Sequence, residues 1–313
     1  MSEAFYAEMD AVYAAAGKEG AEQFLQERRA QALAAGGQTH PDYILVVSEL
    51  GNLYRGLSRY AEALTAYNEA ATVIAAVFGE NSPNYASNLV NTAGAYRMMG
   101  DSDAAWRIFN RAIAIYESLA EVDLYLYAGA LHNMASLCQS RSDFAAAISW
   151  SLRAVALLEE RSDLAGELAV ACSNLSALYQ SNGQPGEAAV FLDRALSIWQ
   201  ESGGGGKDPH YAAALNNKAL RLAAQQELDG ARALLEEART IVRRYFGANA
   251  DYASLSRNLA HICRRSGDTA SALVCLREAE DAFTQVFGPE HPQVSAIRSE
   301  LAAWEQARGW ADA

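Results

Sequence analysis

The sequence predicts an all-α fold, an α-solenoid of tandem helix-turn-helix repeats. The first reason is a period, because one asparagine position recurs along the 313-residue chain at gaps of 42, 41, 43 and 41 residues: Asn91, Asn133, Asn174, Asn217 and Asn258. Glutamates hold the same position towards the ends: Glu8, Glu49 and Glu300. A period of about 20–50 residues is typical of arrays in which each unit buries its apolar side against its neighbours. The second reason is composition, since 51% of the residues are apolar and only 6 are proline, which favours helix.

Six repeats are expected over residues 43–292. They begin near Tyr43, Tyr85, Tyr127, Leu168, Tyr211 and Tyr252. The first repeat carries Tyr43, Val47, Leu50 and Tyr54 at spacings of 4, 3 and 4 residues, and the other repeats keep these spacings. Such spacing places the four side chains on one face of a helix, so that face should be buried. We therefore interpret the tyrosines as core residues and not as an aromatic binding strip.

A turn and a second helix should complete each repeat. Glycine stands in the turn of three repeats, at Gly100, Gly183 and Gly267, which is typical of a left-handed residue that ends a helix. Small residues recur in the first helix, where they let neighbouring helices approach closely: Gly51, Ala93, Ala135, Ser176, Ala219 and Ala260. Alanine recurs at the start of the second helix: Ala63, Ala105, Ala147, Ala188, Ala231 and Ala272.

The two ends depart from the repeat pattern. Residues 1–40 form a degenerate unit in which Tyr13 and Ala21 keep the register, and residues 293–313 supply a closing helix with Trp304. Solenoids need atypical end units to cover their exposed apolar faces. We therefore expect one array over residues 1–313.

Charge and motifs exclude several classes of function. The formal net charge of −13 disfavours a nucleic-acid partner and favours a protein or peptide with basic segments. No membrane span and no signal peptide are expected. The four cysteines form no CxxC pair, which indicates reduced thiols in a cytoplasm. A zinc site from His132, Cys138 and Cys172 would need a spacing that the chain lacks, so no cofactor is expected, and no nucleophile–base arrangement indicates an enzyme.

These columns resemble the tetratricopeptide repeat, and the length of 42 residues resembles its kinesin light chain variety. The turns Gly100-Asp101, Gly183-Gln184 and Gly267-Asp268 match that repeat, as does the segment from Arg59 to Ala63. Leu215-Asn216-Asn217 and the links Phe78-Gly79, Phe246-Gly247 and Phe287-Gly288 match the kinesin light chain variety. The resemblance covers residues 43–292 well and residues 1–40 weakly.

The resemblance implies a right-handed superhelix whose concave side is lined by the first helices and binds peptides or partner proteins. It implies that the asparagine column, Asn91, Asn133, Asn174, Asn217 and Asn258, holds ligand backbone. One residue earlier the chain reads Val90, His132, Ser173, Asn216 and Arg257, so only Arg257 is strongly basic there. His132 and His261 are expected near the same face, either solvated or in a pH-dependent contact, and Arg97 either reaches the groove or is solvated.

Two interpretations of the asparagine column stay open at this point. An amide offers both a donor and an acceptor, which matches a peptide bond of a ligand, but it also suits a bond to a neighbouring helix. The function expected is a non-catalytic scaffold that binds an extended peptide or protein segment. The alternative is a peptide-sensing regulator that changes superhelix shape on binding. The oligomeric state stays open.

Overall fold

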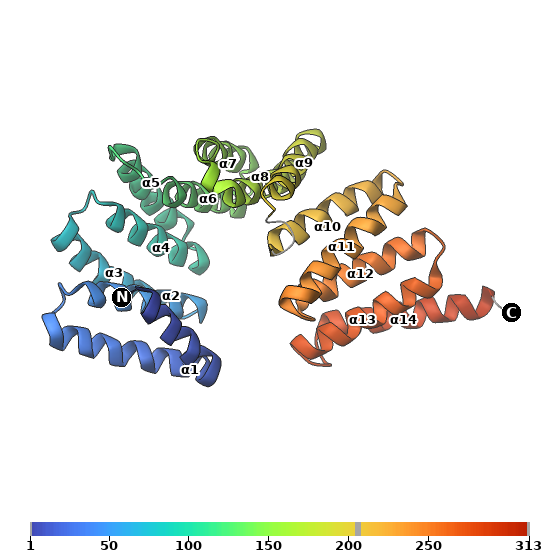
Figure 1. The fold of residues 1–313 in the computed structure, drawn as a ribbon, viewed down its shortest axis with the longest axis horizontal. Coiled ribbons are helices and arrows are strands. Elements are labelled where there is room, and N and C mark those ends of the chain that lie inside the picture. The colour runs from blue at the N-terminus through green and yellow to red at the C-terminus, as the bar shows by residue number, and fades with distance from the viewer. Residues whose placement is uncertain (1, 204–207, 312–313) are drawn as a thin grey trace. The chain divides into compact units, whose positions relative to one another are not determined.

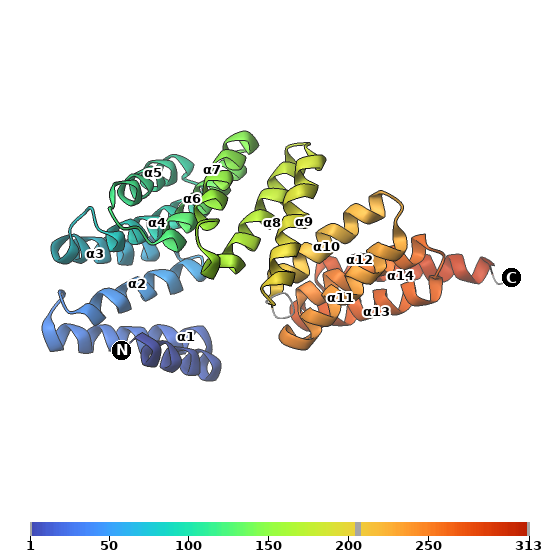
Figure 2. The same cartoon turned by 45° about the horizontal axis from the view of Figure 1, so that its top comes forward.

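The structure, a computed structural model, describes residues 2–203 and 208–311 and consists there of α-helices, one short 3₁₀ helix and connecting turns (Figures 1 and 2). The predicted all-helical class of tandem helix pairs is confirmed. The chain divides into two compact units, Met1–Glu160 and Arg161–Ala313, which are described separately. That all residues form one array stays a prediction.

The first unit holds seven helices within its described residues, coloured blue to green in Figure 1. They are α1 (Ser2–Gly36), α2 (Pro41–Gly56), α3 (Tyr60–Phe78), α4 (Pro83–Met99), α5 (Ser102–Ser118), α6 (Leu124–Ser140) and α7 (Phe144–Leu158). Gly17 interrupts α1 with φ 64° and ψ −154°, a conformation open to glycine. The N-terminal segment is therefore itself two helical stretches joined at Gly17.

The second unit begins with the short helix η1 (Ser162–Leu164). It continues with α8 (Ala165–Ser181), α9 (Pro185–Glu201), α10 (Pro209–Ala224), α11 (Leu228–Phe246), α12 (Ala250–Arg265), α13 (Thr269–Phe287) and α14 (Pro292–Ala311). Proline stands in the first turn of α2, α4, α9 and α10, where its missing N–H costs no helical hydrogen bond. We call α2, α4, α6, α8, α10 and α12 the first helices of their pairs, and the helix after each the second helix.

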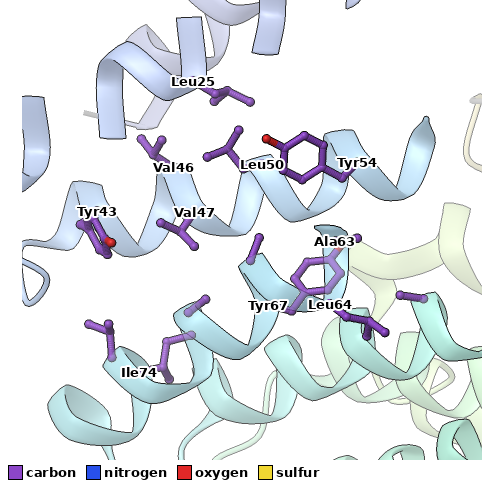
Figure 3. Packing of buried hydrophobic residues seen from close by; sticks show 14 of the residues in the cluster. Leu25, Tyr43, Val46, Val47, Leu50, Tyr54, Ala63, Leu64, Tyr67 and Ile74 are labelled. Carbon is purple, nitrogen blue, oxygen red and sulfur yellow. The ribbon is translucent and has the colours of Figure 1, made fainter. Parts of the chain in front are cut away.

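The core lies between the two helices of each pair. Figure 3 shows Tyr43, Val47 and Leu50 of α2 with their side chains among those of α1 and α3. The core interpretation is confirmed for four tyrosines of the column, which are buried, while Tyr85 is half-buried: Tyr43, Tyr127, Tyr211 and Tyr252. Both small-residue columns are buried throughout, so the helices of each pair approach closely where those columns meet.

Gly51 shows how close this approach is. A Cβ added at Gly51 would lie 2.4 Å from Cε1 of Tyr67, whose ring is fully buried in α3. Glycine at this position lowers the stability of the isolated helix, but it allows the Tyr67 ring of the second helix to lie against the backbone of the first helix.

All six first helices end in the same way. In every pair, the residue two places before the second helix has a left-handed backbone conformation, with φ between 60° and 86°: Ser58, Gly100, Ser142, Gly183, Gln226 and Gly267. The residue after it donates its backbone N–H to a carbonyl five residues earlier, at 2.9–3.0 Å. This is the Schellman arrangement, and it starts the second helix in the same direction each time. Sequence predicted the three glycine positions, and the structure adds three that are not glycine.

The three non-glycine turns predict a stabilising substitution. Ser58→Gly, Ser142→Gly and Gln226→Gly remove a Cβ from a left-handed residue, and each should raise the free energy of unfolding by about 0.5–1 kcal/mol. Ser197→Gly, at an exposed site inside α9, should lower it by a similar amount. Thermal melts of the four single variants check this, and a lower melting temperature for the three turn variants would contradict it.

A second pair of substitutions tests the close approach in α2. Gly51→Ala should destabilise the protein by about 1–3 kcal/mol, because the clash with the Tyr67 ring outweighs the gain in helix propensity. Gly56→Ala, in the same helix, meets no atom within 4 Å and should be neutral or stabilising. Urea denaturation of both variants decides the point, and equal stabilities would show that the approach is not tight.

Candidate functional site

The predicted asparagine column lies on five first helices. Asn91 is on α4, Asn133 on α6, Asn174 on α8, Asn217 on α10 and Asn258 on α12. Four of them are half-buried and Asn217 is exposed. A half-buried amide stabilises a helix only if its hydrogen-bonding groups find partners, so the partners decide which of these residues serve packing.

Asn258 serves packing between two first helices. Its Nδ2 donates to Oδ1 of Asn216 at 2.8 Å, which joins α12 to α10 within the second unit. Asn133 donates to the backbone carbonyl of Gly129 at 2.9 Å, one turn earlier in its own helix. Asn91, Asn174 and Asn217 form no side-chain hydrogen bond with any residue that the structure describes. The column is therefore divided between packing and amides that are available to a ligand.

Arg257 and His261 lie against the closing helix α14. Arg257 forms an ion pair with Glu300 at 2.5 Å from Nη2 to Oε1, and this bond is the main cause that raises the pKa of the guanidinium. Nε2 of His261 is 3.7 Å from Oε2 of the same carboxylate, and its ring meets Trp304 edge-on at 5.2 Å. Burial lowers the pKa of His261, and the charge of Glu300 opposes that shift. These contacts hold α14 on the last pair, so both residues are engaged within the chain.

A polar contact recurs between consecutive first-helix positions. The hydroxyl of Tyr6 donates to Oε1 of Glu49 at 3.0 Å, and burial together with that carboxylate raises the pKa of Tyr6 to about 12. With Asn216–Asn258 and Arg257–Glu300 this gives three contacts at separations of 43, 42 and 43 residues. In each, the later residue occupies the asparagine position or its glutamate equivalent. The position therefore links neighbouring repeats at these three places.

The first unit carries two arginines that form no ion pair between repeats, although the side chain of Arg55 interacts with the hydroxyl of Tyr67. Arg55 and Arg97 occupy the same repeat position, and the Nε of each is shielded from solvent without a hydrogen bond. Neither forms an ion pair with a carboxylate of the described residues. Arg55 Nη1 lies 3.6 Å from where a Cβ of Gly94 would stand, so it extends from α2 over α4. Sequence placed Arg97 in the candidate set and left Arg55 out of it, although the two share a column.

His132 belongs to the same surface. Its side chain reaches solvent, yet the protein packed around it and, second, the charge of Arg97 lower the pKa of its imidazole. A neutral imidazole offers one donor and one acceptor. Arg97, His132 and the amide of Asn91 therefore present hydrogen-bonding groups suited to backbone carbonyls or a carboxylate.

Two searches bear on other classes of site. Among residues 2–203 and 208–311, no group of three or more His, Cys, Asp or Glu side chains is placed to hold a metal ion. No helix in this same part of the chain is both long and apolar enough to cross a membrane.

Stacked helix pairs with a shared polar column define a helical repeat protein. The profile of the tetratricopeptide repeat matches residues 43–118, 166–244, 210–285 and 251–312, and the chain belongs to that family. Repeats of this family generally serve as scaffolds for protein–protein interaction, and its proteins are typically non-catalytic. The predicted resemblance is therefore confirmed.

The chain is also related to kinesin light chain-related proteins. It is 30% identical over 127 residues to Protein KINESIN LIGHT CHAIN-RELATED 3 of Arabidopsis thaliana, a match that spans 40% of this chain and 19% of the relative. Because only about a fifth of that relative is matched, its own activity does not carry over.

Solved structures share the fold. BtubC (BKLC) from P. vanneervenii superposes with a TM-score of 0.64 at 20% identity, over 75% of this chain and 94% of that one. Aspartyl phosphate phosphatase F from Bacillus subtilis gives a TM-score of 0.62 at 15% identity, over 86% and 66%. At these identities the likeness concerns the fold alone.

The division of the column predicts unequal effects of two alanine substitutions. Asn258→Ala removes the donor to Asn216 and should cost about 1 kcal/mol of unfolding free energy. Asn217→Ala removes an exposed amide without a described partner and should change stability by less than about 0.5 kcal/mol. Denaturation of both variants checks this, and equal losses would show that Asn217 also serves packing.

Proposed function

We propose that this protein is a non-catalytic cytoplasmic scaffold whose first helices hold an extended segment of a partner protein. Family membership supports a role in protein–protein interaction. The finer proposal depends on one observation, the set of amides in register that the described chain does not use itself: Asn91, Asn174 and Asn217.

The chemistry of these amides fits a peptide backbone. Each offers a donor and an acceptor, which are the groups that a peptide unit needs. Asn91 and Asn174 are half-buried, so leaving them without partners is unfavourable and a ligand bond would remove that cost. A bound segment thus gains from contacts that the free protein lacks.

Helix spacing sets the register of the ligand. Asn174 and Asn217 lie on α8 and α10 of the second unit. Packed helices are about 8–10 Å apart, and an extended chain advances about 3.3 Å per residue. Two neighbouring amides would therefore meet the ligand backbone about every third residue, which leaves the side chains between free to contact other positions.

In the first unit, Arg97 and His132 add to the amide of Asn91. The guanidinium of Arg97 forms no ion pair with a carboxylate of the described residues, and the imidazole of His132 is favoured in its neutral form. Both can donate to backbone carbonyls of the same segment. Asn133, Asn216, Asn258, Arg257 and His261 are engaged within the chain and are not needed for the proposal.

The experiment is partner capture with a matched pair of variants. The triple variant Asn91→Ala, Asn174→Ala, Asn217→Ala should lose most capture of native partners while its helicity and melting temperature stay close to wild type. The double variant Asn133→Ala, Asn258→Ala should show the reverse, a lower melting temperature with capture retained. Affinity purification with quantitative mass spectrometry measures capture, and cross-linking should map partner segments to α4, α8 and α10. Undiminished capture by the triple variant would overturn the proposal.

A further inference from the structure

Two hollows outside the amide column have the same construction. One, of about 300 Å³, lies among α10, α11 and α12 of the second unit and is lined by Ala212, Ala213, Asn216, Val242, Asp251, Ser254 and Leu255, with Pro209 and His210 beside them. The other, of about 230 Å³, lies between the two parts of α1 and α2 in the first unit. Ligand sites for small molecules are usually about 300–1,000 Å³, and the two hollows lie at or below the lower end of that range, a size that accommodates a single side chain.

The later first helix and the second helix contribute lining residues at matching repeat positions. From the later first helix, Asp251, Ser254 and Leu255 each lie 209 residues after their counterparts Asp42, Leu45 and Val46, which is also the separation of Tyr252 from Tyr43. From the earlier helix, Ala212, Ala213 and Asn216 each lie 208 residues after Ala4, Phe5 and Glu8, which is one residue less than the 209 that relate Asn217 to Glu8, so this side of the hollow is offset by one position. The second helix supplies Val242 in one hollow and Ala32 in the other, 210 residues apart. Both hollows therefore form in the same part of the repeat, with the earlier helix offset by one residue.

The walls are largely apolar and the rim carries an aspartate. Asp251 forms no ion pair and no side-chain hydrogen bond within the described residues. The carboxylate of Asp42 has His40 as its neighbour, at 3.8 Å from Nδ1. Arg28, which lines the hollow in the first unit, is neutralised by an ion pair with Glu8. Each rim thus keeps a negative charge beside an apolar wall.

A middle repeat differs at the same place. Asn84 stands where the two repeats that form the hollows have Asp42 and Asp251, so the negative charge is absent there. Asn88 stands where they have Val46 and Leu255, and this buried amide donates to the backbone carbonyl of Tyr67 at 3.0 Å. In Figure 3, Val46 by contrast projects from α2 towards α1 and contributes an apolar surface.

We propose that each hollow receives one large apolar side chain of a partner segment, with a neighbouring lysine or arginine of that segment paired to Asp42 or Asp251. This rests on the proposed function and names the side chains that such a segment carries. Burial of the apolar side chain supplies affinity, and the aspartate selects the basic neighbour. The net charge of −13 supports a basic partner in general, and the two rims place that preference at defined residues.

A purely structural role of the aspartates makes a different prediction. Both stand in the first turn of a helix, where a negative charge interacts favourably with the helix N-terminus. Their replacement would then lower stability without changing ligand choice. Asp229 provides the matched control, since it lies in the first turn of α11, a second helix, away from either hollow.

The probe is the fluorescein-labelled peptide Ser-Gly-Lys-Phe-Lys-Gly-Ser, compared with the same peptide carrying glutamate for both lysines and with one carrying alanine for phenylalanine. Fluorescence polarisation should show binding of the first peptide at least about fivefold tighter than of the other two, a factor that corresponds to one exposed charge pair of about 1 kcal/mol. Amide chemical shifts of Ala213, Ser254 and Leu45 should move on titration. Tighter binding of the glutamate peptide would overturn the proposal.

Variants separate the hollows from the rest of the surface. Asp42→Asn with Asp251→Asn should weaken the lysine peptide about fivefold or more, whereas Asp229→Asn should not. Ala213→Phe fills the hollow in the second unit and should abolish the chemical shift changes at Ser254. Ala224→Phe, at an exposed site of the same helix, should leave those shift changes unaltered. The inference would be overturned if the variant Asp42→Asn, Asp251→Asn bound the lysine peptide with unchanged affinity, or if the two phenylalanine variants had equal effects. If either of these results were found while the variant Asn91→Ala, Asn174→Ala, Asn217→Ala still lost its native partners, the proposed function would stand and only the role of the hollows would be rejected.

Discussion

The close packing of each first helix against its second helix is the constraint on which the rest of the structure depends. Small residues on both helices, such as Gly51 against the Tyr67 ring, bring the backbones together. That approach fixes the rotation of the first helix about its axis. Once the stripe of Tyr43, Val47, Leu50 and Tyr54 is buried, the asparagine position is set at the edge of the buried face. Its half-buried state follows from packing and not from any choice made for a ligand.

A polar side chain at such an edge has two favourable outcomes. It can bond to the neighbouring first helix, as Asn258 does with Asn216 and Glu300 with Arg257, or it can remain available to an external chain. Which outcome occurs depends on the residue that the preceding helix presents. Tyr6, Asn216 and Arg257 present a group that reaches it, and there the position links repeats. His132 and Ser173 form no such bond with Asn174 and Asn217, and the surface keeps donors and acceptors there that the described chain does not use. A single repeat position thus links repeats in some places and is open in others.

Much of the fold was predictable because periodic burial leaves a periodic sequence. The 4-3-4 stripe, the alanine columns and the glycine turns predicted the helix pairs, and the structure confirms them. The left-handed turns at Ser58, Ser142 and Gln226 were not predicted, since no residue type marks them and the Schellman bond imposes the conformation. The partners of individual amides were not predictable either. Asn216 and Arg257 bond to residues one full repeat away, and such contacts depend on helix spacing and side-chain rotamers that no local pattern records. The assignment of the column to a ligand stays a prediction for the same reason.

Specificity in a repeat array has to come from differences between equivalent positions. Every repeat offers the same backbone and the same place between consecutive first helices, so a ligand that read only those would bind anywhere along the array. The repeats of this chain differ in the side chains that line the space between consecutive first helices. An amide bonded to the carbonyl of Tyr67 occupies it in the repeat of α4, whereas apolar walls with an aspartate rim leave it open beside α2 and α12. Amides in register can hold a backbone of any sequence, but only such unequal places can tell one segment from another. A scaffold built on the amide column therefore needs side-chain sites of this kind to choose its partner, and the two hollows are the sites that we propose for this choice.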